Sequence, residues 1–324
     1  MELVDSFGRT INYLRLSVTD RCNLRCLYCM PPQGVVPCGH DEILSYEELE
    51  ATACAAVALG VRKIRVTGGE PLVRRGIIPF LSRLAAIPHL EHLVLTSNGL
   101  LLAEMAADLK EAGVQRLNVS IDSLKPNLFA TITRGGDLGR VLAGIEAAER
   151  LQIPIKLNMV VMAGVNDQEL ESFARLTLER SLMVRFIEYM PTIADGPAAG
   201  LLLSGSEIMR RLSTLFPLQR VERGAYAGPS QDFTIVGGKG SMGIITPVSG
   251  HLCASCNRIR VTSTGIARSC LFDDNGIDLK PTLRGGDMSA LPALLAQIVR
   301  QKPSGHRFGE PHSPSAVTMS GIGG

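Results

Sequence analysis

The sequence lacks tryptophan, and only 4% of its 324 residues are aromatic. It also lacks an excess of either charge, because 33 Lys and Arg residues are balanced by 31 Asp and Glu residues, for a net charge of +2. Proteins that bind nucleic acid by base stacking and phosphate neutralisation use more aromatic residues and a larger excess of positive charge. Long apolar runs and a signal peptide are missing as well. We therefore expect a cytoplasmic protein that binds neither nucleic acid nor membranes.

Cysteines, in contrast, are concentrated at two places in the chain. Six of the eight form two groups, which are Cys22, Cys26 and Cys29, and then Cys253, Cys256 and Cys270. Disulfides are rare in a reducing cytoplasm, so grouped thiols indicate a metal centre or thiol chemistry. Cys38 in a loop and Cys54 on an alanine-rich helix are predicted to have no such role.

Short β-branched runs alternate with helical stretches over the first two thirds of the chain. The predicted strands are Arg15–Thr19, Lys63–Thr67, His92–Thr96, Arg116–Ile121, Ile155–Val161 and Met183–Tyr189. Amphipathic helices are predicted after a capping box at Ser45–Glu48 and at 76–87, 101–112, 138–150 and 167–180. This alternation predicts an α/β fold with a parallel sheet. Six units favour an incomplete barrel over a closed one, and an open doubly wound sheet is the alternative.

The pattern changes near residue 200, where we predict a boundary between domains 1–200 and 201–324. The second part is expected to contain helices at 205–215 and 287–301, and a hairpin formed by Asn257–Ser263 and Ile266–Phe272. The last residues, 303–324, are rich in Gly, Pro and Ser, a composition typical of a frayed end.

Glycine and polar residues follow several predicted strands, most clearly in the Thr-Gly-Gly-Glu-Pro run at 67–71. Ligands of parallel α/β folds bind at the carboxyl ends of strands, and paired glycines let a ligand approach the backbone. We favour a binding role for this run, whereas an ordinary turn is the better explanation of any other single strand end.

Charged residues interrupt three of the apolar strands, at Arg15, Arg65 and Lys156. Side chains alternate between the two faces of a strand, so a lumen-facing set would make the barrel interior cationic and suited to an anionic substrate. Each side chain could instead reach solvent or pair with a carboxylate.

The spacing Cys22-x3-Cys26-x2-Cys29 allows three thiolates to bind three irons of a cubane cluster and leaves a fourth iron open. A zinc site completed by Cys38 or His40 is the alternative. For Cys253-x2-Cys256-x13-Cys270, spacing alone favours structural zinc beside the hairpin.

The first triad, the aromatic Tyr28 before its last cysteine, and Gly-Gly-Glu-Pro at 68–71 together resemble the signature of radical S-adenosylmethionine (SAM) enzymes. With the second triad included, the sequence resembles the GTP 3′,8-cyclase family of molybdenum cofactor biosynthesis over essentially its whole length. Further matching segments are Val18–Asn23, Phe186–Pro191, Asn257–Arg260 and Met319–Gly324.

This resemblance implies a radical SAM partial barrel and a C-terminal domain that carries a second 4Fe-4S cluster. The first cluster, on Cys22, Cys26 and Cys29, would bind SAM, and the second, on Cys253, Cys256 and Cys270, would bind the substrate. An external one-electron reductant would cleave SAM to a 5′-deoxyadenosyl radical. That radical would take the ribose 3′ hydrogen of GTP, and the ribose radical would attack guanine C8. The product would be 3′,8-cyclo-7,8-dihydroguanosine 5′-triphosphate.

The resemblance also assigns individual contacts. SAM contacts fall on Tyr28, Gly69, Ser120 and Met190. GTP contacts fall on Arg15, Arg65, Thr96, Lys156, Arg258, Ile259 and Arg260. Arg258 and Arg260 would be catalytic, and the terminal glycines, Gly323 and Gly324, would reach the active site. The expected partners are the reductant and a downstream enzyme that takes the product, with the chain a monomer or a homodimer.

Two rival interpretations stay open at this point. One is a peptide-modifying radical SAM enzyme with an auxiliary cluster, which would ignore GTP. The other is a non-catalytic zinc protein that binds nucleic acid through its cysteine hairpin, which the charge balance and the absence of tryptophan support poorly.

Overall fold

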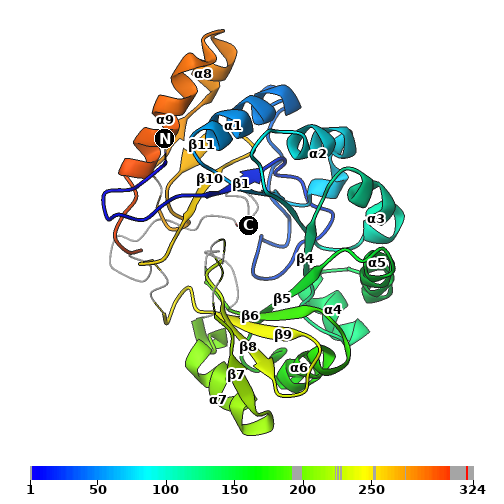
Figure 1. Ribbon diagram of the computed structural model, residues 1–324. Coiled ribbons are helices and arrows are strands. Elements are labelled where there is room, and N and C mark those ends of the chain that lie inside the picture. Colours follow the sequence, from blue (N-terminus) through cyan, green and yellow to red (C-terminus); the bar gives the residue numbers. More distant parts are fainter. Residues whose placement is uncertain are drawn as a thin grey trace.

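The computed structural model describes residues 2–191, 199–222, 224, 226, 228–250, 253–273, 275–306 and 319 (Figure 1). Within these residues no helix combines the length and the hydropathy needed to cross a bilayer. Their strands form one sheet in the order β12-β11-β10-β1-β2-β3-β4-β5-β6-β9-β8-β7.

The strands of this sheet are β1 (Tyr13–Ser17), β2 (Lys63–Thr67), β3 (His92–Ser97), β4 (Arg116–Ser120), β5 (Ile155–Val161), β6 (Met183–Glu188), β7 (Leu218–Arg220), β8 (Gln231–Ile235), β9 (Ser241–Ile245), β10 (Arg258–Val261), β11 (Ile266–Arg268) and β12 (Ile277–Asp278). From β1 to β6, each strand pairs in parallel with the next. The predicted incomplete six-unit barrel is therefore confirmed, and only the first strand begins two residues earlier than expected.

The α-helices are α1 (Tyr46–Ala58), α2 (Ile77–Ala85), α3 (Leu102–Glu111), α4 (Pro126–Thr133), α5 (Leu138–Arg150), α6 (Leu170–Glu179), α7 (Gly205–Leu215), α8 (Lys280–Arg284) and α9 (Leu291–Arg300). Helices α1 to α6 lie outside the curved sheet, so the concave face is left for a ligand (Figure 1). The capping box that opens α1 is formed in both directions, since Ser45 and Glu48 each accept the other's backbone N–H.

Alternation along the strands separates the core from the lumen. Leu14 and Leu16 on β1 and Ile64 on β2 are completely buried in the hydrophobic core beneath the helices. Arg15 and Arg65 occupy the intervening positions and line the internal cavity. The charges that interrupt these strands thus mark the concave face, because successive side chains of a strand point to opposite sides.

The last third of the chain extends both edges of the barrel sheet. Strand β10 pairs in parallel with β1, and β9 pairs in parallel with β6. The predicted hairpin is present as the antiparallel pair β10 and β11. Sequence patterns did not indicate α4, α8 or the strands β7, β8, β9 and β12. Because the sheet continues past residue 200, the division at that residue remains a prediction.

Candidate active site

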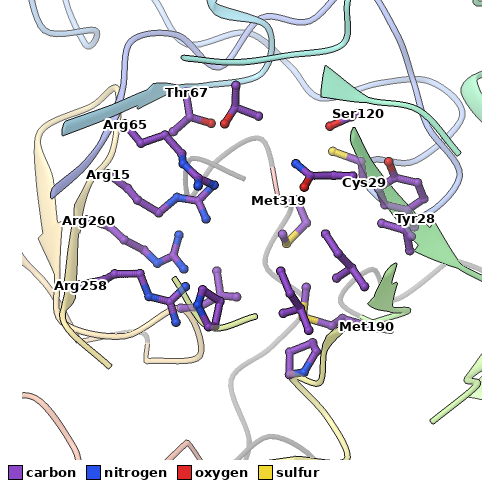
Figure 2. A pocket seen from close by; sticks show the side chains of 18 of the residues that line it. Arg15, Tyr28, Cys29, Arg65, Thr67, Ser120, Met190, Arg258, Arg260 and Met319 are labelled. Atoms are coloured by element: carbon purple, nitrogen blue, oxygen red, sulfur yellow. The ribbon is translucent and has the colours of Figure 1, made fainter. Parts of the chain in front are cut away.

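A cavity of about 310 Å³ lies inside the barrel, and both cysteine triads line it. This volume is at the lower end of the range for small-molecule sites. Figure 2 shows Tyr28, Cys29, Ser120 and Met190 on one side, with arginines from β1, β2 and β10 on the other. The cavity therefore brings together residues from the first and last quarters of the chain.

The first triad lies on the loop that follows β1. Cys26 O accepts hydrogen bonds from the backbone N–H of Cys29 (2.9 Å) and of Met30 (3.2 Å), which tightens the loop between the thiols. Cys22 Sγ accepts the N–H of Leu24 at 3.4 Å. Burial raises the pKa of Cys22, and it raises that of Cys26 further because Asp122 and the other thiols add negative charge nearby. Three thiols that form no disulfide therefore line the same cavity.

The two side chains proposed to complete a zinc site face elsewhere. Cys38 and His40 line a separate hollow, together with Asp20, which accepts the N–H of Cys38 at 2.7 Å. Among the described residues, no three His, Cys, Asp or Glu side chains are grouped as ligands of a single metal ion. The three thiols of each triad line the shared cavity without Cys38 or His40, which favours the cluster interpretation of the first triad.

The Gly-Gly-Glu run packs against the loop that leads into the first triad. A Cβ on Gly69 would lie 2.3 Å from Arg21 O, next to Cys22 in the chain, so only glycine fits there. Gly69 N–H donates to Thr19 O at 2.7 Å, and Glu70 N–H donates to Arg21 O at 2.8 Å. The run therefore holds the cysteine loop in place by backbone hydrogen bonds, and Gly69 also lines the cavity.

The side chain of Glu70 is almost completely buried, with 1% of its surface exposed. Its carboxylate accepts the N–H groups of Leu72 (3.1 Å) and Asn98 (2.6 Å) and the hydroxyl of Ser97 (2.9 Å). Burial outweighs these bonds and raises the pKa of Glu70 to about 7. Glu70 thus joins the Gly-Gly run to the end of β3.

Four arginines lie side by side across four neighbouring strands. Arg15 is in register with Arg260 on β10 and with Arg65 on β2, and Arg260 is in register with Arg268 on β11. Like charges at directly opposed positions destabilise a sheet. Burial lowers the pKa of Arg15 well below its usual value, and Arg260 and Arg65 add to the effect. Such an arrangement is suited to an anion that compensates several charges at once.

Three cavity-lining arginines have buried N–H groups that lack a hydrogen-bond acceptor among the described residues. Buried N–H groups of Arg65, Arg185 and Arg260 have no acceptor among the described residues, and the buried hydroxyl of Thr96 likewise has no partner there. All four residues line the cavity. Buried donors normally have acceptors, so these four indicate where oxygen atoms of a ligand would bind.

More cations lie toward the amino ends of the strands. Lys156 is not part of the cavity lining. It lies near Arg185, Arg116 and Lys63. Burial and these charges lower the pKa of Lys156 to about 6, and burial, followed by the Arg65 charge, lowers that of Arg185 to about 10. Sequence reasoning missed Lys63, Arg116 and Arg185. Arg185 interrupts an apolar strand as Arg15 does, so the same signal would have found it.

The second triad borders the opposite end of the cavity, beside β10. Cys256 N–H donates to Cys253 O at 3.0 Å, a turn that directs both segments to one side. Burial raises the pKa of Cys256, but Arg258 and Lys302 outweigh it and bring the pKa to about 6. Arg258 and Arg260 line the cavity, whereas the Ile259 side chain between them is buried on the other face.

Residues predicted to contact SAM or GTP therefore come together, with two qualifications. Tyr28, Gly69, Ser120, Met190, Arg15, Arg65, Thr96, Arg258 and Arg260 all line the cavity. Lys156 lies outside that lining, and Ile259 faces away from it. The terminal Gly323 and Gly324 lie outside the described residues, but Met319 from the same segment lies in the cavity (Figure 2).

Comparison with known proteins agrees with this geometry. Residues 16–177 match the Radical SAM superfamily, and residues 182–308 match the family described as Molybdenum Cofactor Synthesis C. A GTP 3′,8-cyclase of Geobacter sulfurreducens is 58% identical over the full length of both chains. The chain belongs to the GTP 3′,8-cyclase family. A GTP 3′,8-cyclase of Moorella thermoacetica is 46% identical and covers 99% of both chains.

Solved structures outside the GTP 3′,8-cyclase family share the fold. SuiB of Streptococcus suis bound to S-adenosylmethionine has a TM-score of 0.63 at 11% identity, over 90% of this chain and 69% of SuiB. Native anSMEcpe with bound AdoMet has a TM-score of 0.60 at 13% identity, over 95% of this chain and 94% of that one. At such identities the likeness establishes the radical SAM fold alone. The two 4Fe-4S clusters and SAM are the cofactors of the family, and they fit the two triads of cysteines that form no disulfide and the Gly69 backbone beside the first triad.

Proposed function

We propose that this chain converts GTP to 3′,8-cyclo-7,8-dihydroguanosine 5′-triphosphate, an early step of molybdenum cofactor biosynthesis. One observation carries the proposal: the arginine row of Arg65, Arg15 and Arg260 lines the same cavity as both cysteine triads and lies opposite Cys29 in it. A polyanionic substrate held by the row would therefore lie between the two triads. The relatives named GTP 3′,8-cyclase support GTP as that substrate.

The first triad and its surroundings would hold SAM. Cys22, Cys26 and Cys29 supply thiolates, and Gly69 lines the cavity beside them while its backbone packs against Arg21 of the cysteine loop. Ser120 and Met190 line the same side (Figure 2). These residues would hold a 4Fe-4S cluster and SAM, which on receiving an electron from the external reductant would supply the 5′-deoxyadenosyl radical chemistry that joins the ribose C3′ of GTP to guanine C8. The position of the cavity inside the barrel would limit the access of water to this chemistry.

The substrate would be held from the opposite side. Arg15, Arg65 and Arg185 present N–H groups suited to phosphate oxygens, with Lys156 behind them at the amino ends of the strands. Thr96 adds a hydroxyl donor. Cys253, Cys256 and Cys270 would hold the second cluster against the guanine.

Arg258 and Arg260 are the residues that we assign to catalysis. Both lie on β10 between the second triad and the arginine row, with the Ile259 backbone between them. From there their guanidinium groups can hold the nucleotide in position while the new ring closes.

The reaction also needs partners outside the chain. We assign it an external one-electron reductant and a downstream enzyme that processes the cyclic product. We place the reaction in the cytoplasm, with the enzyme acting as a monomer or a homodimer.

Anaerobic reconstitution with iron and sulfide tests the proposal. We expect dithionite, SAM and GTP together to give 5′-deoxyadenosine and a new GTP-derived species, quantified by chromatography, whereas ATP, CTP and UTP give little of either. SAM cleavage that ignores GTP would contradict the substrate assignment, and a protein with zinc but no iron and sulfide would contradict the whole proposal.

A matched pair of variants tests the arginine row. Arg260→Ala should leave iron content unchanged but weaken GTP binding by about 10- to 100-fold, since a charged hydrogen bond contributes about 1.5–3 kcal/mol. Arg140→Ala is the control, because Arg140 is exposed and pairs with Glu104 on the surface. Equal GTP turnover by both variants at limiting GTP would remove Arg260 from the site.

A further inference from the structure

A buried lysine lies behind the second cysteine triad, on the side away from the cavity lining. Lys302 follows directly on α9, and only 3% of its surface is exposed. Burying an ammonium group without compensation costs several kcal/mol, so such a residue is kept by specific partners. In this chain the partners of Lys302 belong to the two segments that carry the cysteines.

The ammonium group joins these two segments. Its Nζ donates to Arg258 O at 2.8 Å, two residues after Cys256, and to Ser269 O at 2.5 Å, the residue before Cys270. One side chain therefore fixes the separation of Cys256 and Cys270. These cysteines lie at the beginning and the end of the β10–β11 hairpin, whose own ladder is short.

A second cation holds the remaining member of the triad. Arg9, from the amino-terminal segment, donates to Cys253 O at 2.7 Å and to Pro303 O at 2.6 Å, and its Nε pairs with the buried carboxylate of Asp5 at 2.5 Å. The segment 302–304 is thus connected to all three cysteine positions. Of the two cations, only Lys302 lacks a carboxylate partner among the described residues, so its charge is left for the thiolates.

The electrostatics agree with this placement. Burial lowers the pKa of Lys302, while Cys256 and Cys270 act in the opposite direction. A fixed cation beside thiolates stabilises them and any further negative charge placed on the group they bind.

We propose that Lys302 is a positioning residue for the second cluster: its hydrogen bonds set the separation of Cys256 and Cys270, and its charge compensates for their thiolates. The inference rests on the proposed function, in which this triad holds a 4Fe-4S cluster. Reduction adds one negative charge to the cluster, so the buried cation raises the reduction potential. The second cluster of the wild-type chain is therefore easier to reduce than it would be without Lys302.

The experiment isolates the second cluster in the full-length chain. In a background that carries Cys22→Ala, Cys26→Ala and Cys29→Ala, iron and sulfide are counted after reconstitution, and the cluster is titrated with dithionite under EPR observation. Three changes are then compared in that background. Lys302→Gln keeps hydrogen-bond donors without the charge, and Lys302→Arg keeps both. Lys110→Gln is the control, because exposed Lys110 also donates to a carbonyl, Leu151 O at 2.8 Å, on another helix.

We expect a more negative reduction potential and altered g-values in Lys302→Gln, and values near the background in Lys302→Arg and Lys110→Gln. Loss of the cluster in Lys302→Gln with retention in Lys302→Arg also supports the proposal. A potential in Lys302→Gln equal to that of Lys110→Gln would overturn it, as would loss of the cluster in both Lys302 variants. An iron-free background protein would instead overturn the cluster assignment of the proposed function, and this inference with it.

Discussion

The hydroxyl of Tyr28 donates a hydrogen bond to Asp122 across the cavity wall, at 2.8 Å. The other carboxylate oxygen of Asp122 accepts the N–H of Val160 at 2.9 Å. Tyr28 lies between Cys26 and Cys29 in the chain, so this pair ties the first cysteine loop to the carboxyl ends of β4 and β5. Burial raises the pKa of Asp122 to about 6, which leaves the carboxylate mostly ionised at neutral pH.

The Tyr28–Asp122 bond gives the first prediction. Tyr28→Phe leaves one oxygen of a buried carboxylate without a donor and should lower the free energy of unfolding by about 1–3 kcal/mol. Asp122→Asn should cost less, because its amide can accept from Val160 N–H and donate to the Tyr28 oxygen. Urea unfolding of the metal-free protein measures both. The reverse order of stability would show that the bond does not hold the loop.

The close packing of Gly69 against Arg21 O gives the second prediction. Gly69→Ala places a methyl group 2.3 Å from Arg21 O, so the backbone next to Cys22 must move. We expect the variant to bind fewer irons at the first triad and to lose SAM binding. Gly200→Ala is the control, since a Cβ there meets nothing within 4 Å. Iron analysis and SAM titration check the outcome, and a Gly69→Ala protein that binds iron and SAM like the control would contradict it.

The third prediction concerns pH and Glu70. Its pKa is about 7 in the folded protein against 4.5 for an unperturbed glutamate, so the folded state binds one more proton between these pH values. The free energy of unfolding should therefore decrease as pH rises through this window, by on the order of 2–3 kcal/mol from this group.

Glu70→Gln removes that contribution. Although the variant loses one acceptor at every pH, the stability of the metal-free wild type relative to Glu70→Gln should decrease as pH rises from about 5 to about 8. Chemical denaturation across this range measures it. Parallel curves for the two proteins would mean that Glu70 titrates as an ordinary carboxylate.

The carboxyl terminus gives the fourth prediction. Met319 lines the cavity, and Gly323 and Gly324 follow it by a few residues in the sequence. Removal of Gly323 and Gly324 should leave SAM binding intact and reduce the yield of the cyclic product, because slim glycine backbone can enter where larger residues cannot. A truncated protein with full product yield would show that the two glycines are an ordinary chain end.

Sequence patterns predicted the parts of the fold that repeat. The six barrel strands, the helix at 205–215 and the β10–β11 hairpin follow from periodicity and turn residues. The pairing of β10 with β1 and of β9 with β6 could not be predicted that way, because it joins segments far apart in the chain. Strand β9, Ser-Met-Gly-Ile-Ile, is too short to distinguish from a loop before its neighbour is known.

In the site, too, local sequence patterns predicted some residues, whereas others depend on how distant strands pair. A charge inside an apolar strand revealed Arg15 and Arg65, and Arg185 carries the same signal. Lys63 and Arg116 are the first residues of their strands, where a charge usually reaches solvent, so pattern alone could not assign them to the lumen. That Arg65, Arg15 and Arg260 are laterally adjacent depends on strand register, which the sequence of any one strand does not encode.

The pairing of β1 with β10 has a consequence for synthesis on the ribosome. Strand β1 is made almost at once, yet its outer neighbour emerges only near residue 258, on the order of ten to forty seconds later at bacterial elongation rates. Strand β6, at the other edge of the barrel, likewise lacks its outer neighbour until β9 has been synthesised. During that interval both margins of the nascent barrel expose unpaired backbone that can recruit other strands. The last third of the chain thus protects the barrel formed by the first two thirds from aggregation, and a fragment that ends near residue 200 would have no such protection.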